Sequence, residues 1–310
     1  MALTSTHQGF YRGAARYAAE HDWHIVADVI YDATIPVGSR GEGILSFVGH
    51  WDDLAKYVTS AGVPVVEISS VRKDLSVPSV MEDNGAIGRL GGEHLLERNL
   101  KNFAWAPFSD DAVNEERFRG FAASVREAGF DCLRLLPFST RRDSRLNRHL
   151  NWTLRRRRVI KMIRSLRHPL GIFCYNDCVA ADIVDACIEA SIQIPDQGAV
   201  LGVDNDPVIC DCVQVPLSSV RHDLEGMAYE AAALLDRLIN GEAPPEIPQR
   251  IAPKGVVTRR STELLAVEDP TGQHGVEVHP SKVLRGQLIG RRRRRALSST
   301  SAIVGTCVST

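Results

Sequence analysis

Short apolar runs that alternate with amphipathic helical segments constrain the fold of this 310-residue chain more than any other feature. The runs are aliphatic and bounded by Gly, Pro or Asp, as strands of a buried parallel sheet usually are. The segments between them carry apolar residues at helical spacing, and some open at capping residues such as Asp83 and Asp223. The expected strands are residues 24–30, 43–48, 63–69, 102–108, 132–138, 171–176 and 198–204, and the expected helices are 8–21, 84–98, 113–129, 178–191 and 223–240.

This alternation predicts an α/β protein with doubly wound parallel sheets. The length exceeds what one hydrophobic core ordinarily serves, so two lobes are expected, with a break near residues 99–101. Ligands of open α/β sheets bind beyond the carboxyl ends of the strands. Polar residues directly after the apolar runs are therefore the candidates for a binding site.

Composition limits the partners and the cellular location that we expect for the protein. The net charge of -1 gives no whole-molecule reason to expect a polyanionic partner, and the seven cysteines form no CxxC pair. The start of the chain has no basic leader followed by an apolar region, and no apolar run approaches the ~20 residues that span a bilayer. We expect a cytoplasmic protein with reduced cysteines and no membrane partner.

Two arginine-rich stretches suggest nucleic-acid binding at first sight. Arg155 to Arg158 are consecutive, however, so steps of ~100° scatter them around a helix, which favours a solvated helix surface. Arg291 to Arg295 lie in residues 271–310, which show neither helical nor strand periodicity. Such a segment cannot bury enough apolar surface to offset its own conformational entropy, so we expect it to be disordered.

Several polar residues stand where strands end or helices begin, and together they could hold a polyol. A carboxylate, an amide and a guanidinium that converge on one crevice can bond adjacent hydroxyls, and an aromatic ring can stack on a sugar. Asp177 and Asp204 could equally cap the next element, which spacing alone favours, and Trp152 could simply pack on its own lobe. The candidates are Thr4, Ser5, Thr6, Arg117, Trp152, Asn176, Asp177 and Asp204.

No enzyme motif is present. The histidines form no HExxH, there is no GxSxG or GxxxxGK[ST], and the cysteines near 174–187 lack histidines at zinc spacing. The glycines of NGAIGRLGGEHL do not follow a long strand in dinucleotide-binding form, which favours helix packing against the sheet. We therefore expect a binding protein without catalysis, cofactor or metal.

Five segments occur in an order that resembles a known family: GFYRGAARYA, EDNGAIGRLGGEHLLERNLKNFAW, ERFRGF, CYNDCVAADIVDACIEASIQIPDQGAVLGVDNDP and PLSSVRHDLEGMAYEAAALLDRLINGE. The series resembles the effector-binding core of the lac-repressor and periplasmic sugar-binding superfamily. VVTRRSTELLAVEDP resembles the corresponding stretch of xylose-operon regulators, in which an AraC-type pair of helix-turn-helix units follows the core. The resemblance covers about residues 1–270.

The resemblance implies a two-lobed, periplasmic-binding-protein-like (type I) fold, in which each lobe is a parallel sheet flanked by helices and three crossovers form a hinge. It places the crossovers near 99–102, 217–222 and 241–247, the first lobe at 1–100 plus 221–241, and the second lobe at 101–218 plus 245–265.

The resemblance also implies a sugar pocket between the lobes. Arg117 matches the position whose guanidinium clamps sugar hydroxyls, and Asn176, Asp177 and Asp204 match ligand-contacting positions at strand ends. Thr4, Ser5 and Thr6 stand after the first strand, and Trp152 resembles a stacking aromatic. For Asp204 and Arg117, the resemblance favours ligand contact over a merely structural role.

The family further implies the sensing module of a bacterial regulator that binds a pentose such as xylose and forms a homodimer. Operator DNA is a partner only if the full-length protein has a helix-turn-helix domain. Two departures stand out: the first strand is reduced to Met1–Leu3, and residues 271–310 contain no amphipathic helix. Our hypotheses are a start codon farther upstream or a stunted strand, and an out-of-frame tail.

Three other functions compete with this one. A stand-alone sugar-binding protein without DNA-binding activity would ordinarily carry an export signal, and a sugar-modifying enzyme would turn over its sugar. Direct nucleic-acid binding through the arginines would show a strong salt dependence.

Overall fold

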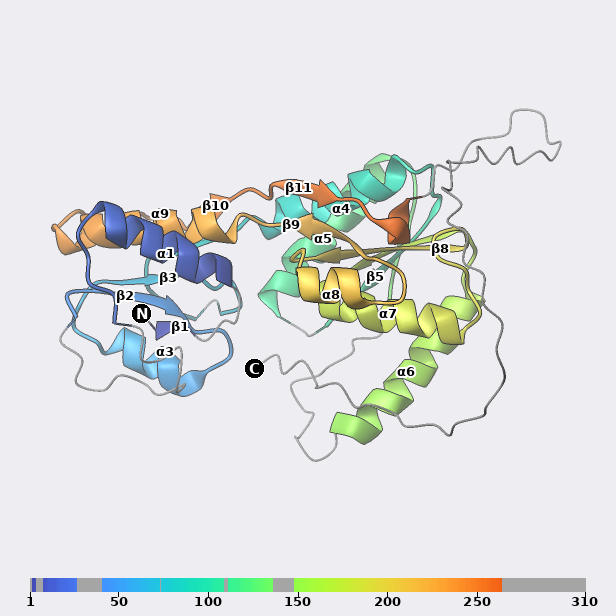
Figure 1. Cartoon of the computed structure of the whole chain (residues 1–310), viewed down its shortest axis with the longest axis horizontal. Coiled ribbons are helices and arrows are strands. Elements are labelled where there is room, and N and C mark those ends of the chain that lie inside the picture. Colours follow the sequence, from blue (N-terminus) through green and yellow to red (C-terminus); the bar gives the residue numbers. More distant parts are fainter. Residues whose placement is uncertain are drawn as a thin grey trace, which may run out of the picture. The chain divides into compact units, whose positions relative to one another are not determined.

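The computed structural model describes residues 2–3, 8–26, 41–72, 74–108, 111–135 and 148–263 (Figure 1). The candidates Thr4, Ser5 and Thr6, and the tail at 271–310, lie outside these residues. Trp152 lies in a described helix, but its side chain belongs to the part that is not described. Among the helices in the described ranges, none combines the length and hydrophobicity that a bilayer crossing requires.

The first lobe is built on a parallel sheet with the strand order β1-β2-β3. Its strands are β1 (Ala2–Leu3), β2 (Ile44–Phe47) and β3 (Val65–Glu67), and its helices are α1 (Gln8–Glu20), α3 (Asp52–Thr59) and α9 (Leu224–Ile239). Figure 1 shows α1 and α9 on one side of this sheet and α3 on the other. Phe10 of α1, Val66 of β3 and Met227 of α9 belong to one buried cluster. A helix from late in the chain therefore closes a core that the first strands begin.

The second lobe contains a six-stranded sheet with the order β11-β9-β8-β7-β5-β6, in which only the β11–β9 pair is antiparallel. Its strands are β5 (Asn102–Ala106), β6 (Cys132–Arg134), β7 (Leu170–Cys174), β8 (Gly198–Val203), β9 (Ser218–Arg221) and β11 (Gly255–Val257). Its helices are α4 (Asn84–Leu96), α5 (Ala112–Glu127), α6 (Arg148–Ser165), α7 (Asp177–Glu189) and α8 (Pro207–Cys212). One apolar cluster joins the sheet to α6 and α7, and another joins it to α4 and α5.

Glycines let α4 and α5 approach until their backbones touch. A Cβ added to Gly88 would lie 2.0 Å from the carbonyl oxygen of Arg117, and one added to Gly120 would lie 2.1 Å from that of Gly85. Gly91 faces the sheet instead, where a Cβ would lie 2.5 Å from the ring of Phe173. The packing role expected for these glycines is confirmed, and it extends to α5 as well as the sheet.

The chain passes from the first lobe to the second before α4, earlier than expected. Strand β4 (Val80–Glu82) pairs with β10 (Gln249–Ile251), and α4 then packs on α5 and contacts β7, β9 and β11. The sequence places residues up to 100 in the first lobe, because the expected break at 99–101 directly precedes the strand expected at 102–108. We propose Asp83 as the boundary, with further passages at 221–224 and 251–255. Residues 249–251, which were expected in the second lobe, pair with β4 instead.

Most expected elements are present, with ends shifted by a few residues. Of the strand expected at 24–30, residues 24–26 are not in a strand and the rest lie outside the described part. On the basic helix α6, Arg156 pairs with Glu189 of α7 at 3.0 Å, whereas Arg157 and Arg158 are exposed. The predicted scatter of these arginines around the helix is confirmed for the side chains that are described.

A run of hydroxyl hydrogen bonds fastens the 3-10 helix η1 (Arg260–Thr262) to the second lobe; we call Arg259 to Thr262 the clasp. Ser261 Oγ donates to the carbonyl of Val200 at 2.6 Å, and Thr262 Oγ1 donates to Ser218 Oγ at 2.7 Å. Because Thr262 uses its hydrogen in this way, His94 Nε2, 2.8 Å away, must be the donor to Thr262. His94 thus donates to the clasp through Nε2, as the Nε2–H tautomer of a neutral ring can.

We expect acid to weaken the fold through His94. Burial, with a smaller contribution from the charge of Arg98, lowers its pKa from 6.5 to about 3. Between these values the unfolded chain binds a proton that the folded protein rejects, so this contribution to stability is present above pH 6.5 and is lost as the pH falls. From pH 7 to pH 5 the loss is about 2 kcal/mol, at ~1.4 kcal/mol per pKa unit.

Urea unfolding of wild-type protein and His94→Gln at the two pH values measures this effect. Glutamine keeps an N–H donor without a titrating ring, so the variant should lose less stability between pH 7 and pH 5. Equal losses in the two proteins would contradict the assignment.

Candidate functional site

A continuous series of polar contacts joins the strand ends of the second lobe to β4 and the loop after β3. Two predicted residues, Arg117 and Asp204, belong to it. We call this group the polar cluster; it comprises Ser70, Glu82, Asn84, Asp111, Arg117, Tyr175, Asp204 and His222. It places donors and acceptors of several kinds within reach of one another.

Arg117 stands at the centre of the polar cluster and is 3% exposed. Its Nε donates to Asn84 Oδ1 at 2.8 Å, and its Nη1 donates to the carbonyl of Tyr175 at 2.6 Å. The guanidinium also lies over the ring of Tyr175, with Cζ 5.3 Å from the ring centroid. Two of its edges are thus held by protein groups, which sets the plane in which the remaining N–H groups can meet a ligand.

Asp204 is presented by a strained backbone. It follows β8 with a φ of 113°, and its neighbour Asn205 has a φ of 53°. Residues other than glycine adopt such φ values at a cost of ~1–3 kcal/mol each. Residues with this backbone strain are concentrated at functional sites. The strain aims the carboxylate at His222, whose Nε2 lies 2.7 Å from Asp204 Oδ1.

His222 connects Asp204 to Glu82. The side chain is 4% exposed, and its Nδ1 lies 3.8 Å from Glu82 Oε1. Nδ1 has no hydrogen-bond partner among the described residues. A buried ring nitrogen without a partner is costly, and a ligand hydroxyl is one group that could satisfy it.

Ser70, which follows β3, and Asn84, which follows β4, extend the cluster around Glu82. Ser70 Oγ donates to Glu82 Oε2 at 3.2 Å, and Asn84 Nδ2 donates to Ser70 Oγ at 3.0 Å. At the other end, the hydroxyl of Tyr175 donates to Asp111 Oδ2 at 3.4 Å. Burial and the nearby charge of Asp111 raise the pKa of Tyr175, so its hydroxyl stays protonated and remains a donor.

Asn176 and Asp177 occupy capping and buried positions rather than the polar cluster. Asn176 Oδ1 caps α7 by accepting from Val179 N at 3.0 Å. Asp177 is 0% exposed, and its carboxylate accepts from Ser219 Oγ at 2.6 Å and from Asp206 N at 2.8 Å. Burial and the charge of Asp204 raise the pKa of Asp177 to about 8. Asp177 therefore holds the loop that presents Asp204, whereas Asn176 serves as the helix cap, a role that the sequence suggested for its neighbour Asp177.

Six members of the cluster were not predicted from the sequence: Ser70, Glu82, Asn84, Asp111, Tyr175 and His222. Glu82 ends β4, and His222 follows β9, so both satisfy the rule that polar residues after strands line the site. The two strands are three and four residues long and contain Glu, Ser and Arg, which hid them from a search for apolar runs.

The charges of the cluster suit a neutral ligand. Glu82, Asp111 and Asp204 supply carboxylates against the single guanidinium of Arg117 within the cluster. Carboxylates accept from hydroxyls, and a guanidinium donates to them, so this set can bind a polyol. A phosphate or carboxylate on the ligand would meet predominantly negative surroundings. Within the described residues, no three His, Cys, Asp or Glu side chains gather as metal ligands would.

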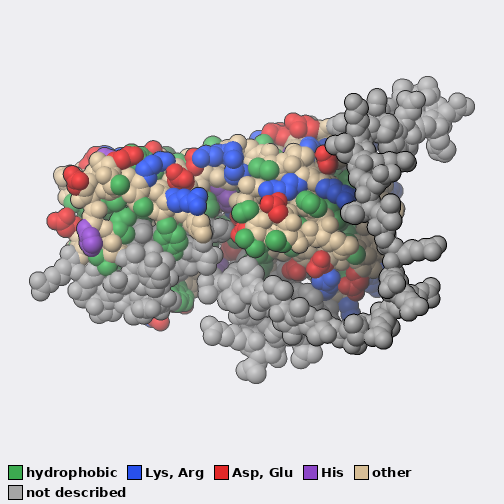
Figure 2. Space-filling model, in the orientation of Figure 1, with side chains coloured by type: hydrophobic (Ala, Val, Ile, Leu, Met, Phe, Trp, Pro, Cys, Tyr) green, Lys and Arg blue, Asp and Glu red, His purple; other side chains and the backbone are tan. Residues whose placement is uncertain are grey.

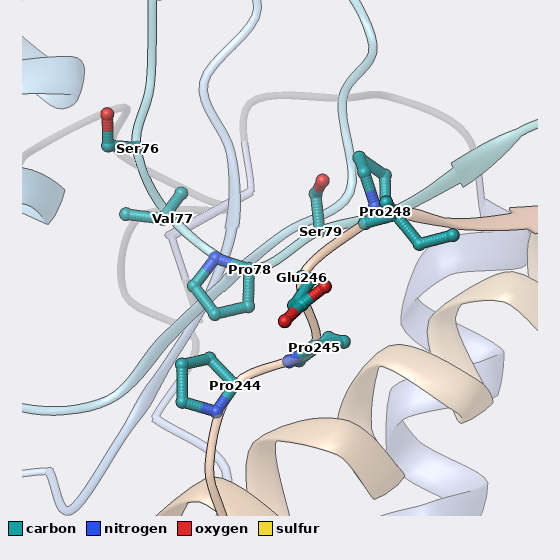
Figure 3. A pocket seen from close by; sticks show the side chains of 9 residues that line it. Ser76, Val77, Pro78, Ser79, Pro244, Pro245, Glu246 and Pro248 are labelled. Carbon is teal, nitrogen blue, oxygen red and sulfur yellow. The ribbon is translucent and has the colours of Figure 1, made fainter.

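A separate pocket lies beside the loops that flank β4 and β10 (Figure 3). It is lined by residues 76–79 and 244–248, including four prolines, and Glu246 supplies its charged side chain. None of these residues belongs to the polar cluster. This pocket offers few hydrogen-bonding side chains.

Charges of both signs are interspersed on the face drawn in Figure 2. Arg16 pairs with Glu225 at 2.8 Å, Lys254 with Asp223 at 2.7 Å and Arg250 with Glu116 at 2.8 Å. These neighbouring basic residues are neutralised locally and do not form a basic stripe for a nucleic-acid backbone.

Comparison with known proteins finds regulators of sugar operons among the relatives of this chain. It is 26% identical over 282 residues to the xylose operon regulatory protein of Escherichia coli K12, a match covering 86% of this chain and 69% of the relative. It is 28% identical over 194 residues to the protein of the same name from Haemophilus influenzae, which covers 62% of this chain and 49% of the relative. The matched region thus spans about half to two thirds of these curated relatives.

The fold agrees with these matches. The solved structure of the xylose-binding transcription activator XylR superposes with a TM-score of 0.72 at 23% identity, covering 87% of this chain and 70% of that one. Residues 93–262 match the model of the periplasmic binding protein-like domain. The predicted type I fold, with lobes of parallel sheet flanked by helices, is confirmed, and the relatives named here are regulators rather than enzymes. The chain belongs to the family of proteins with a periplasmic-binding-protein-like domain.

Proposed function

We propose that this chain is the effector-binding part of a sugar-responsive transcriptional regulator, and that it binds a neutral pentose such as xylose at the polar cluster. The observation that carries the proposal is the placement of Arg117 and Asp204 in one contact series, with the strained Asp204 backbone and the unpartnered His222 Nδ1 beside them. The names of the relatives support the sugar class.

In this proposal the chemistry of each side chain sets its hydrogen-bonding role. Arg117 donates to ring or hydroxyl oxygens, whereas Asp204 and Glu82 accept hydroxyl hydrogens. A hydroxyl close to His222 Nδ1 satisfies that nitrogen when the sugar is bound. Because Glu82 ends a strand of the β4–β10 pair and Asp204 follows a strand of the six-stranded sheet, a sugar held by both favours one arrangement of the hinge.

Asn176, Asp177 and Trp152 complete the proposal in different ways. The amide nitrogen of Asn176 is available to a ligand while its oxygen caps α7. Asp177 acts by holding the loop of Asp204, and Trp152 is proposed to stack on the sugar ring. Thr4, Ser5 and Thr6 are proposed to face the sugar from the first lobe.

Control of an operon belongs to the proposal for the full-length regulator. Operator DNA would be bound by a helix-turn-helix domain, and the regulator would act as a homodimer. Sugar binding by this chain is the part that can be tested on it directly.

A thermal-shift panel tests the proposal. Neutral pentoses and hexoses are compared with xylonate and xylulose 5-phosphate at millimolar concentration. A sugar present at 100 times its Kd stabilises the folded protein by about 2.7 kcal/mol, which should raise Tm by about 5 °C or more. We expect at least one neutral pentose to do so and the charged sugars to have no effect. If no neutral monosaccharide raises Tm, the proposal is wrong.

A further inference from the structure

We propose that Arg259 couples the loop that presents Asp204 to the clasp, which lies near the C-terminal end of the described residues. The loop, residues 204–206, is called the ligand loop below. The inference rests on the proposed function, because contact between Asp204 and the sugar is itself a proposal. It adds a route by which the bound state reaches residues 259–262, which are far from Asp204 in the sequence.

The side chain of Arg259 touches the ligand loop directly. Its Nη1 donates to Asn205 Oδ1 at 2.9 Å and to the carbonyl of Leu217 at 3.0 Å. Its Nε lies 2.9 Å from Asp211 Oδ1 in α8. Asn205 therefore shares one guanidinium nitrogen with a carbonyl of the segment that leads into β9.

Backbone strain in the ligand loop favours a change of its conformation. Asp204 and Asn205 both hold positive φ values, at 113° and 53°, and neither residue is a glycine. External contacts keep them there: Asn205 N donates to Ser219 Oγ at 2.9 Å, and Asp206 N donates to Asp177 Oδ2 at 2.8 Å. A sugar that binds Asp204 in this geometry stabilises the strained conformation, and without the sugar the strain favours relaxation.

The backbone of Arg259 passes any displacement to the clasp. Its N–H donates to Ser218 Oγ at 2.8 Å, and its carbonyl accepts from the same hydroxyl at 2.8 Å. Ser218 Oγ also accepts from Thr262, which accepts from His94. The hydroxyls thus form one hydrogen-bonded series from His94 to Arg259. A shift of Arg259 requires the whole series to adjust.

A contact of Arg98 with the clasp provides a control, because it attaches to the clasp without linking it to the ligand loop. Arg98 Nε donates to the carbonyl of Thr262 at 2.5 Å, but within the described residues Arg98 makes no hydrogen bond to the ligand loop. Arg98 therefore contacts the clasp but not the ligand loop, whereas Arg259 contacts both the clasp and the ligand loop. The two arginines form a matched pair for an experiment.

Hydrogen exchange of the intact chain, with and without a saturating neutral pentose, measures the coupling. The reporters are the amides of Arg259, Ser261 and Thr262, which donate to Ser218 Oγ, the Pro216 carbonyl and the Arg259 carbonyl. We expect the sugar to slow their exchange at least fivefold, the lower end of ordinary coupling between two sites.

Two variants remove the link in different ways. Asn205→Gly deletes the acceptor while tolerating the positive φ, and Arg259→Lys keeps a cation near Asp211 but loses the geometry that reaches two acceptors. In both variants, the sugar should slow exchange less than twofold while calorimetry still detects binding. Arg98→Lys should exchange faster in both states and keep the fivefold difference.

The outcomes separate this inference from the proposed function. Slowing that persists in both Asn205→Gly and Arg259→Lys overturns the coupling role, as does wild-type protein that binds sugar with no slowing at the clasp. Wild-type protein that binds no sugar by calorimetry overturns the proposed function, and the coupling falls with it.

Discussion

Replacing Gly88 by Ala is expected to lower the free energy of unfolding by about 3 kcal/mol, the upper part of the usual range for overpacked sites. The new Cβ would lie 2.0 Å from the carbonyl oxygen of Arg117 and 2.8 Å from Phe121 N, and both are backbone atoms that cannot turn aside. α4 and α5 must then separate, which also displaces Arg117 from Asn84. Urea unfolding followed by circular dichroism measures the stability.

Gly85→Ala is the matched control on the same helix. A Cβ there meets only Asp83 Oδ1 at 3.4 Å, an ordinary contact distance. Alanine also has a higher helix propensity than glycine, by ~1 kcal/mol in a helix interior. We expect Gly85→Ala to be as stable as the wild type or more stable. Equal destabilisation by both substitutions would show that the close approach of α4 and α5 is not the cause.

Replacing Arg117 by Lys should reduce the affinity for the neutral pentose about 100-fold, or ~2.7 kcal/mol of binding free energy. Lysine keeps the positive charge but cannot reproduce the planar guanidinium that bonds Asn84 Oδ1 and the Tyr175 carbonyl together. The cluster then loses both its geometry and a donor to the sugar. Isothermal titration calorimetry measures the change.

Arg119→Lys provides the control, because Arg119 lies on the same helix and is exposed. It should bind the pentose as the wild type does. An affinity of Arg117→Lys within threefold of the wild type would remove Arg117 from the binding site.

The sequence predicted the parts of the fold that depend on long aliphatic runs. Strands such as β7 and β8 are fully buried and read plainly as apolar segments between capped helices. The sequence did not predict β4, β9 and β10, because short strands that contain Ser, Glu, Arg or Gln have no apolar pattern. The positions of these strands follow from pairing with residues far away in the chain. The early passage into the second lobe was missed for the same reason.

The site was only partly predictable, because its residues combine local and distant contacts. Asn176 and Asp177 stand after a strand, as ligand residues do, but their caps and buried bonds appear only in the folded chain. The sequence did not predict His222 as a site residue, because it stands in no recognisable motif. Its position between Asp204 and Glu82 is set by three different strands. Residue type at a strand end identified the region, and tertiary contacts decided which side chains meet there.

The first lobe has a consequence for how the protein is made. Phe10 and Val66 are buried against Met227 and Leu235, which the ribosome adds only after the whole of residues 84–221. Until α9 emerges, the apolar faces of α1 and β3 have no helix to cover them. Growing chains with such uncovered surface are prone to aggregate and to engage chaperones. The lobe that begins first is therefore completed late, and we expect the yield of folded protein to depend on protecting its N-terminal half during synthesis.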